Sequence, residues 1–323
     1  MRELAQQAGT TIEFARTFWR AMGFPVVSDD QPNFASDDVE ALAAWAAAVD
    51  AGTVDRDTMV SLIRAQSYNM DRLALWQMEA IVARIQRRDG VDDTTARAYV
   101  LEHMSEYDSF VSAQLAYTWR RQMEWLAERV DNEIHARTEH DLHDVLPLPR
   151  ALGFADMVSF TSTARQLGSR ELTELVQGFE FTARHVITAN GARVVKMVGD
   201  AVLYIADDVV TAARVGLALI EAVRTNPQLL PVRASLVWGR IVSRSGDVFG
   251  PAVNLASRLI DVAPRDCLYT DESTAALLAK SPYAADFLQL LRDPVDLEGI
   301  GELSPVELKW SDPALMESLW LPD

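Results

Sequence analysis

The sequence predicts two domains of different class: an all-α domain over residues 1–137 and an α/β domain over residues 150–323, joined by a linker at residues 138–149. A length of 323 residues suits two domains rather than one. Near residue 138 the pattern changes, because apolar residues at helical spacing give way to short apolar runs that alternate with helices. Hydrophobic residues make up 49% of the chain, enough for a core in each domain.

The first half shows only helical patterns. Apolar residues recur at helical spacing in four segments, most of them bounded by capping or glycine signals. These predicted helices cover residues 10–23, 36–52, 55–88 and 94–135. The linker that follows is polar, contains His140 and His143, and ends in Leu-Pro-Leu-Pro.

Strands and helices alternate in the second half. Helices are predicted to begin at Ser169, at Asp208 and at Pro251, where proline suits the first helical position. Gly199-Asp200 is a two-residue hairpin signal between two apolar runs. The predicted strands cover residues 151–157, 193–198, 201–205, 232–242 and 267–270, with two more around 299–310. This order predicts helices packed on a mixed sheet.

Composition excludes several classes of protein. A net charge of −17 argues against broad binding to nucleic acid. No apolar stretch approaches the roughly 20 residues that span a bilayer, and the N-terminus lacks the features of a signal peptide. Cys267 is the only cysteine, which rules out an intrachain disulfide. We therefore expect a cytoplasmic protein without a membrane span.

Two aspartates stand where apolar strands end. Asp156 closes one strand and Asp200 lies in the hairpin turn. If the two strand ends meet, the carboxylates suit Mg²⁺ or Mn²⁺, with phosphate oxygens completing the coordination. The alternative is that Asp200 forms a turn and Asp156 caps a helix.

The segment from residue 157 to residue 161 precedes a helix. Its backbone N–H groups suit a triphosphate, and the Thr161 hydroxyl is a further candidate. We include Met157 among the predicted metal ligands and Phe160 among the substrate contacts. The alternative is an ordinary loop between a strand and a helix.

Lys196 and Asp247 form the candidate base-recognition pair. The chain has only three lysines, Lys196, Lys280 and Lys309, and Lys196 lies four residues before Asp200. A lysine donates to adenine N1, and an aspartate accepts from the 6-amino group, whereas guanine presents the reversed pattern. The alternative is a solvated lysine on a strand.

Asn254 and Arg258 are four residues apart on one predicted helix and share a face. Arginine suits the charge that grows on a transferring phosphate, and asparagine suits a ribose. The alternative is a polar stripe on an amphipathic helix. Arg240 is a further candidate for the terminal phosphates.

Three segments, residues 154–161, 196–200 and 247–258, together resemble the class III nucleotidyl cyclase catalytic domain, and the resemblance extends over roughly residues 148–312. It implies an α+β, ferredoxin-like fold and conversion of ATP to cyclic AMP and pyrophosphate. It assigns two Mg²⁺ or Mn²⁺ ions per site to Asp156 and Asp200, and adenine selection to Lys196 with Asp247. It also assigns ribose orientation and transition-state stabilisation to Asn254 and Arg258.

The resemblance further implies that the chain pairs with a second copy of itself as a head-to-tail homodimer. One subunit then supplies the metal carboxylates, and the other supplies the base-recognition and transition-state residues. The helical half is similar, more weakly, to regulatory domains of soluble bacterial cyclases, so we expect it to regulate catalysis through the linker. Two alternatives stay open. Residues 4–22 are similar to the start of a MerR-type DNA-binding motif, and the catalytic domain could be a nucleotide sensor without turnover.

Overall fold

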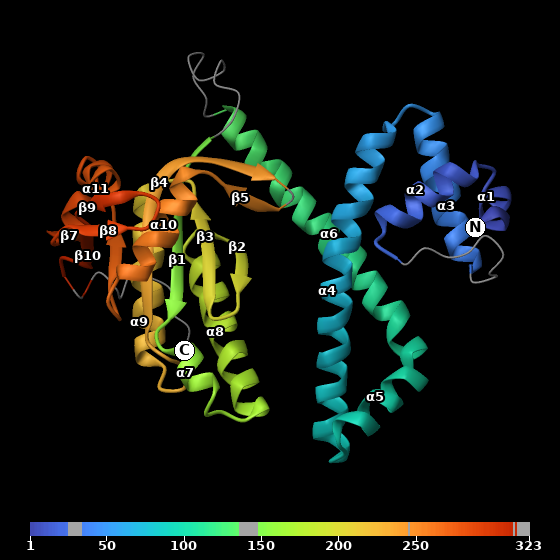
Figure 1. Ribbon diagram of the computed structural model, residues 1–323, viewed down its shortest axis with the longest axis horizontal. Helices are drawn as coiled ribbons and strands as arrows, with labels where there is room; N and C mark the ends of the chain where they lie inside the picture. Colours follow the sequence, from blue (N-terminus) through green and yellow to red (C-terminus); the bar gives the residue numbers. More distant parts are fainter. Residues whose placement is uncertain (25–33, 136–147, 245, 313, 315–323) are drawn as a thin grey trace. The chain divides into compact units, whose positions relative to one another are not determined.

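The computed structural model describes residues 1–24, 34–135, 148–244, 246–312 and 314, and the chain divides into two compact units, Met1–Arg137 and Thr138–Asp323 (Figure 1). Most of the predicted linker, with His140 and His143, lies outside the described residues. Its last two residues belong to the first strand, which begins at Leu148. Within the described ranges, no helix has the length and apolar character needed to cross a membrane.

The first unit is helical over its described residues, as predicted. Its helices are α1 (Arg2–Gln7), α2 (Ile12–Ala21), α3 (Ser36–Asp50), α4 (Arg56–Asp89), α5 (Asp93–Glu102) and α6 (Met104–His135). Aspartate caps start two of them: Asp55 accepts from the Thr58 N–H, and Asp92 from the Thr95 N–H. Gly90 ends α4 in the left-handed conformation.

The prediction of one continuous helix over residues 94–135 was wrong. The segment 94–135 is two helices, because the chain leaves helical geometry at His103. The His103 ring stacks on Tyr99, with ring centroids 4.0 Å apart, and its Nδ1 lies 2.8 Å from the Tyr99 carbonyl oxygen. Helix α1 was also not predicted.

The core of the first unit explains the aromatic residues of α2. Phe14 and Phe18 are buried with Leu42 of α3 and Met59 of α4. These two phenylalanines therefore serve the packing of the helical unit. A smaller apolar cluster joins the end of α4 to α5.

The second unit is built on a mixed sheet with helices on both faces. Its strand order is β2-β3-β1-β4-β6-β10-β7, β5 pairs with β4, and β8 and β9 form a separate hairpin. The β4–β6 pair is parallel and the other pairs are antiparallel. The strands are β1 (Leu148–Met157), β2 (Arg193–Val198), β3 (Ala201–Ala206), β4 (Val232–Arg244), β5 (Asp247–Phe249), β6 (Leu268–Thr270), β7 (Phe287–Leu291), β8 (Val295–Leu297), β9 (Gly301–Leu303) and β10 (Val306–Trp310).

Two apolar clusters bury the two faces of the sheet. The larger holds α8 (Ser169–Ala189), α9 (Val209–Thr225) and α11 (Glu272–Ala279) against one face. The smaller packs α10 (Pro251–Val262) against the other face, together with Leu297 of β8. A short helix, α7 (Phe160–Ala164), follows β1. The predicted strands and helices of this half are confirmed, while α11, β5, β7 and β8 were not predicted.

Glycines allow two close contacts that bring these layers together. A Cβ on Gly153 of β1 would overlap the ring of Tyr204, which is buried and donates to the Ala212 carbonyl oxygen at 3.0 Å. A Cβ on Gly239 of β4 would lie 2.5 Å from the Ala252 Cβ, so α10 rests directly on β4. Both contacts depend on the missing side chain.

Candidate active site

The predicted carboxylates meet at one end of the sheet. Asp156 is near the end of β1 and opposite Ala201 of β3, and Asp200 precedes β3 in the hairpin turn. The Met157 N–H donates to the Asp200 carbonyl oxygen at 3.0 Å, which ties the two strand ends together. Gly199 adopts a φ of 62°, the left-handed conformation that the turn requires.

The electrostatics of Asp156 reflect this crowding. Burial raises the pKa of the Asp156 carboxyl above its ordinary value, and the charge of Asp200 adds to the rise, while hydrogen bonds from Arg233 oppose it. A partly buried carboxylate beside a second carboxylate is a donor set that gains from a cation.

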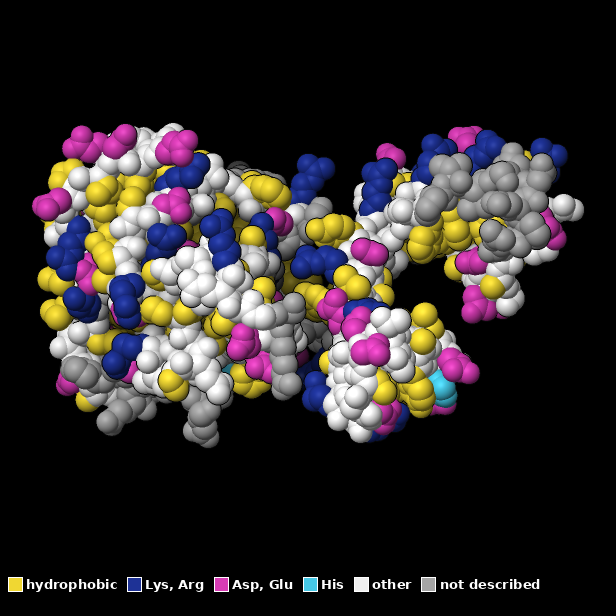
Figure 2. Space-filling view, turned by 60° about the horizontal axis from the view of Figure 1, so that its bottom comes forward, with side chains coloured by type: hydrophobic (Ala, Val, Ile, Leu, Met, Phe, Trp, Pro, Cys, Tyr) yellow, Lys and Arg dark blue, Asp and Glu magenta, His cyan; other side chains and the backbone are white. Residues whose placement is uncertain are grey.

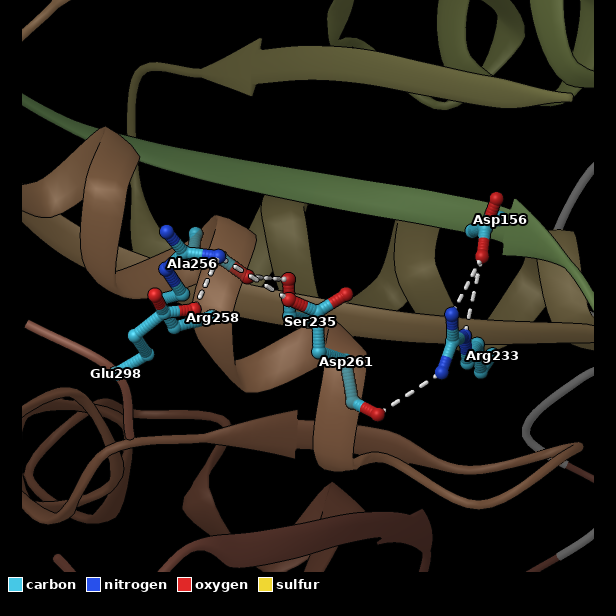
Figure 3. Close-up of polar contacts among 7 residues, drawn as sticks. All are labelled: Asp156, Arg233, Ser235, Ala256, Arg258, Asp261 and Glu298. Carbon is cyan, nitrogen blue, oxygen red and sulfur yellow. Dashed lines mark hydrogen bonds and ion pairs between the residues drawn. The ribbon is translucent and has the colours of Figure 1, made fainter. Parts of the chain in front are cut away.

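Arg233 is the residue that sequence reasoning missed. It lies opposite Asp156 in the β1–β4 register. Its Nη2 and Nε donate to Asp156 Oδ2 at 2.9 and 3.1 Å, and its Nη1 donates to the Asp261 carbonyl oxygen of α10 at 2.9 Å (Figure 3). The available signal was an arginine near the start of an apolar strand, but only the strand order reveals its partner.

The loop after β1 differs in part from the predicted phosphate cradle. The N–H groups of Met157 and Val158 donate to the carbonyl oxygens of Asp200 and Pro231, so two of the predicted donors already have backbone acceptors. The Met157 side chain is buried in the core, which leaves only its carbonyl oxygen as a possible metal ligand. Phe160 packs against the core, and Thr161 is exposed.

Lys196 and Asp247 meet although 51 positions separate them. Lys196 Nζ lies 2.6 Å from Asp247 Oδ2. A register shift between Val194 and Lys196 interrupts the β2–β3 ladder beside the lysine. On the other side, Asp247 Oδ1 accepts from the Val248 N–H at 2.8 Å. The structure therefore brings together the two residues that the sequence assigned to the base.

The pair is partly open to solvent and charged. The Lys196 and Asp247 side chains are 41% and 31% exposed. Burial opposes ionisation of Asp247, but the hydrogen bonds from Lys196 and Val248 outweigh it, so the pKa of this carboxyl lies below its ordinary value.

Asn254 and Arg258 lie on α10, as predicted. Pro251 occupies the first turn of this helix after Gly250, and the Ser235 hydroxyl of β4 donates to the Ala256 carbonyl oxygen at 2.7 Å. Arg258 forms ion pairs with Asp261 and with Glu298, which follows β8 (Figure 3).

Arg240 is the last of the predicted substrate contacts. It is exposed on β4, and its carbonyl oxygen would lie 2.9 Å from a Cβ on Gly250. The structure places its backbone at the base of α10, and its predicted contact with phosphate stays a prediction.

Comparison with known proteins shows the family of this chain. The family model described as the adenylate and guanylate cyclase catalytic domain matches residues 150–309. A protein named adenylate cyclase from Glutamicibacter nicotianae is 36% identical over 315 residues, which cover 95% of this chain and 77% of that protein. The chain belongs to the class III nucleotidyl cyclase family. The predicted resemblance and fold class are therefore confirmed.

Further relatives and a solved structure are similar to this chain. An adenylate cyclase from Streptomyces coelicolor is 36% identical over 282 residues, which cover 86% of this chain and 71% of the relative. A protein from Mycobacterium tuberculosis named pH-sensitive adenylate cyclase is 27% identical over 93% of this chain and 75% of its own length. The solved adenylyl cyclase CyaB from P. aeruginosa is 18% identical, covers 52% of this chain and 98% of that structure, and has a TM-score of 0.44.

Proposed function

We propose that this cyclase converts ATP to 3′,5′-cyclic AMP and pyrophosphate. The observation that carries the proposal is the Lys196–Asp247 pair, with 2.6 Å between Nζ and Oδ2. A donor next to an acceptor matches the N1 and 6-amino edge of adenine and mismatches guanine, which presents a donor at N1 and an acceptor at O6. The relatives named adenylate cyclase support the same substrate.

The residues at the end of β1 fit a divalent metal. Asp156 and Asp200 offer carboxylate oxygens and Met157 a carbonyl oxygen, which are the ligands that Mg²⁺ and Mn²⁺ accept, and substrate phosphates complete such shells. Among the described residues, no three His, Cys, Asp or Glu side chains form a metal-binding group. We propose two ions per site. When bound, they would activate the ribose 3′-hydroxyl and neutralise phosphate charge.

The roles of the chain's own residues follow from their positions. Arg233 donates to Asp156 through Nε and Nη2, so it would orient this carboxylate as a metal ligand, and it is a candidate donor to the phosphates. Arg258 would stabilise the charge that develops as the 3′-oxygen bonds to the α-phosphorus and pyrophosphate leaves. Asn254 would orient the ribose, and Phe160, Thr161 and Arg240 are retained as candidate substrate contacts.

We further propose that each site forms between two copies of the chain arranged head to tail. Within one chain, Arg258 forms its ion pairs with Asp261 and Glu298 rather than with Asp156. A second copy would bring Arg258, Asn254 and the base-recognition residues of one subunit to the metal-binding carboxylates, Asp156 and Asp200, of the other. This arrangement explains why one chain carries both halves of the chemistry.

We also propose a cytoplasmic enzyme whose helical unit regulates catalysis, with pH as the input that the histidines of the linker favour. A relative named pH-sensitive adenylate cyclase supports this input.

Lys and Arg side chains occur across the face of the catalytic unit seen in Figure 2, so the overall charge of −17 does not describe every surface that a nucleotide meets.

The test is direct assay of the purified full-length protein with ATP or GTP and Mg²⁺ or Mn²⁺, with the products separated by chromatography. We expect cyclic AMP from ATP and far less product from GTP. Asp156→Ala and Asp200→Ala should each abolish turnover without unfolding the protein. Near-normal product from Asp200→Ala would contradict the two-carboxylate assignment.

A further inference from the structure

The arginine assigned to the transition state lies between two carboxylates. Arg258 Nη1 is 3.7 Å from Asp261 Oδ2 and 3.8 Å from Glu298 Oε2 (Figure 3). Asp261 is three residues further along α10, whereas Glu298 comes from the turn between β8 and β9. The guanidinium that should face phosphate is therefore already paired with two anions.

The backbone holds Glu298 close to Arg258. The turn is tight, because the Ile300 N–H donates to the Leu297 carbonyl oxygen at 2.9 Å and Gly299 adopts a φ of 76°. Leu297 is 2% exposed and packs in the apolar cluster that contains Leu259 of α10. The residue before Glu298 is thus fixed against the helix that carries Arg258, although the Glu298 side chain itself is 88% exposed.

We propose that Glu298 sets the affinity of this cyclase for its nucleotide by competing with phosphate for Arg258. The inference rests on the proposed function, because it takes Arg258 as a phosphate-facing residue. Ion pairs between exposed groups are weak, so a polyphosphate can displace Glu298, but the displacement costs part of the binding energy.

Glu298 is a better residue to change than Asp261. The Asp261 carbonyl oxygen accepts from Arg233, and the Asp261 charge contributes to the raised pKa of Asp156. A substitution at Asp261 would therefore disturb the metal end of the site as well. Glu302, which is exposed on β9 of the same hairpin, offers a matched control that removes one negative charge at a different position.

The experiment compares wild type, Glu298→Gln and Glu302→Gln in two assays. Steady-state cyclisation of ATP gives kcat/KM, and binding of 3′-deoxy-ATP, which lacks the attacking hydroxyl, gives affinity without turnover. Glu298→Gln should raise kcat/KM and tighten binding by about threefold, the worth of an exposed ion pair. The gain should shrink at high salt, and Glu302→Gln should leave both quantities unchanged.

The same binding assay in an Arg258→Ala background tests whether the effect acts through Arg258. Glu298→Gln should then give no gain, because the competition no longer exists. A gain that persists, an equal gain from Glu302→Gln, or weaker binding by Glu298→Gln would each overturn the proposal. A wild type that binds the analogue but forms no cyclic nucleotide would refute the proposed function, while the binding comparison would still decide the role of Glu298.

Discussion

Changing both Lys196 and Asp247 should switch the base preference of the enzyme. Glu at position 196 accepts from the guanine N1–H and 2-amino groups, and Ser at position 247 donates to O6. The double variant Lys196→Glu with Asp247→Ser should therefore use GTP at the expense of ATP. The pair is joined at 2.6 Å, so both residues must change together.

The structure sets the size of the effect. The side chains are 41% and 31% exposed, so the ion pair contributes at most about 1 kcal/mol to folding, and its loss should leave the protein folded. When a base covers the pair, each mismatched group is buried without a partner and costs about 1–3 kcal/mol. Even 2 kcal/mol in total would change the ratio of kcat/KM for ATP and GTP by roughly 30-fold.

The assay measures kcat/KM for ATP and GTP in wild type, both single variants and the double variant, with the unfolding midpoint as a control for folding. The single variants should lose activity toward ATP without gaining GTP, since Lys196→Glu sets two carboxylates side by side and Asp247→Ser leaves the lysine without its partner. The pKa of Asp247 is lowered in the folded protein. The stability that this carboxylate contributes is therefore present at pH values above the ordinary aspartate pKa of 3.8, and it is lost only as pH falls through the folded-state pKa. At neutral pH the Asp247 carboxylate of the wild type is therefore charged. An unchanged base ratio in a folded double variant would refute the assignment of the pocket.

Three further outcomes are expected. Asp156→Asn should abolish turnover yet raise the unfolding midpoint at pH 7. The pKa of Asp156 is raised in the folded protein, so its charged form destabilises the fold above that pKa, and the gain should vanish near pH 4. A lower midpoint at pH 7 would contradict this prediction. Gly153→Ala should cost about 1–3 kcal/mol of unfolding free energy, because the new Cβ would overlap a buried tyrosine ring. Gly168→Ala should cost far less, because a Cβ at that position has room. Equal losses of the two variants in urea unfolding would refute this. Changing His140 and His143 to Gln should flatten the pH–activity profile of the full chain, and a superimposable profile would exclude these histidines as the pH input.

Local patterns predicted the elements that carry the site. Gly199-Asp200 identified the β2–β3 turn, and Pro251 identified the start of α10, because each residue imposes a backbone conformation that depends on few neighbours. The Lys196–Asp247 contact came from resemblance and not from local pattern, since 51 positions separate the two residues.

The features that escaped prediction depend on tertiary pairing. Arg233 is one residue of a strand until the sheet order sets it opposite Asp156, and Glu298 is a turn residue until β8 packs on α10. The break at His103 escaped because apolar spacing continues through it, while contacts of its ring with Tyr99 mark the helix end. Short elements such as β5 and β8, of three residues each, are too brief for periodicity to reveal.

The shared active site is the central claim, and mixing two inactive variants tests it most directly. Asp156→Ala lacks a metal carboxylate, and Arg258→Ala lacks the transition-state arginine. In a heterodimer of the two, one site carries both lesions and the other carries neither. Differently tagged variants are co-expressed, purified over both tags, and assayed for cyclic AMP. Activity near half that of wild-type dimers, with each variant inactive alone, is the predicted result. Inactivity in verified heterodimers would contradict the account.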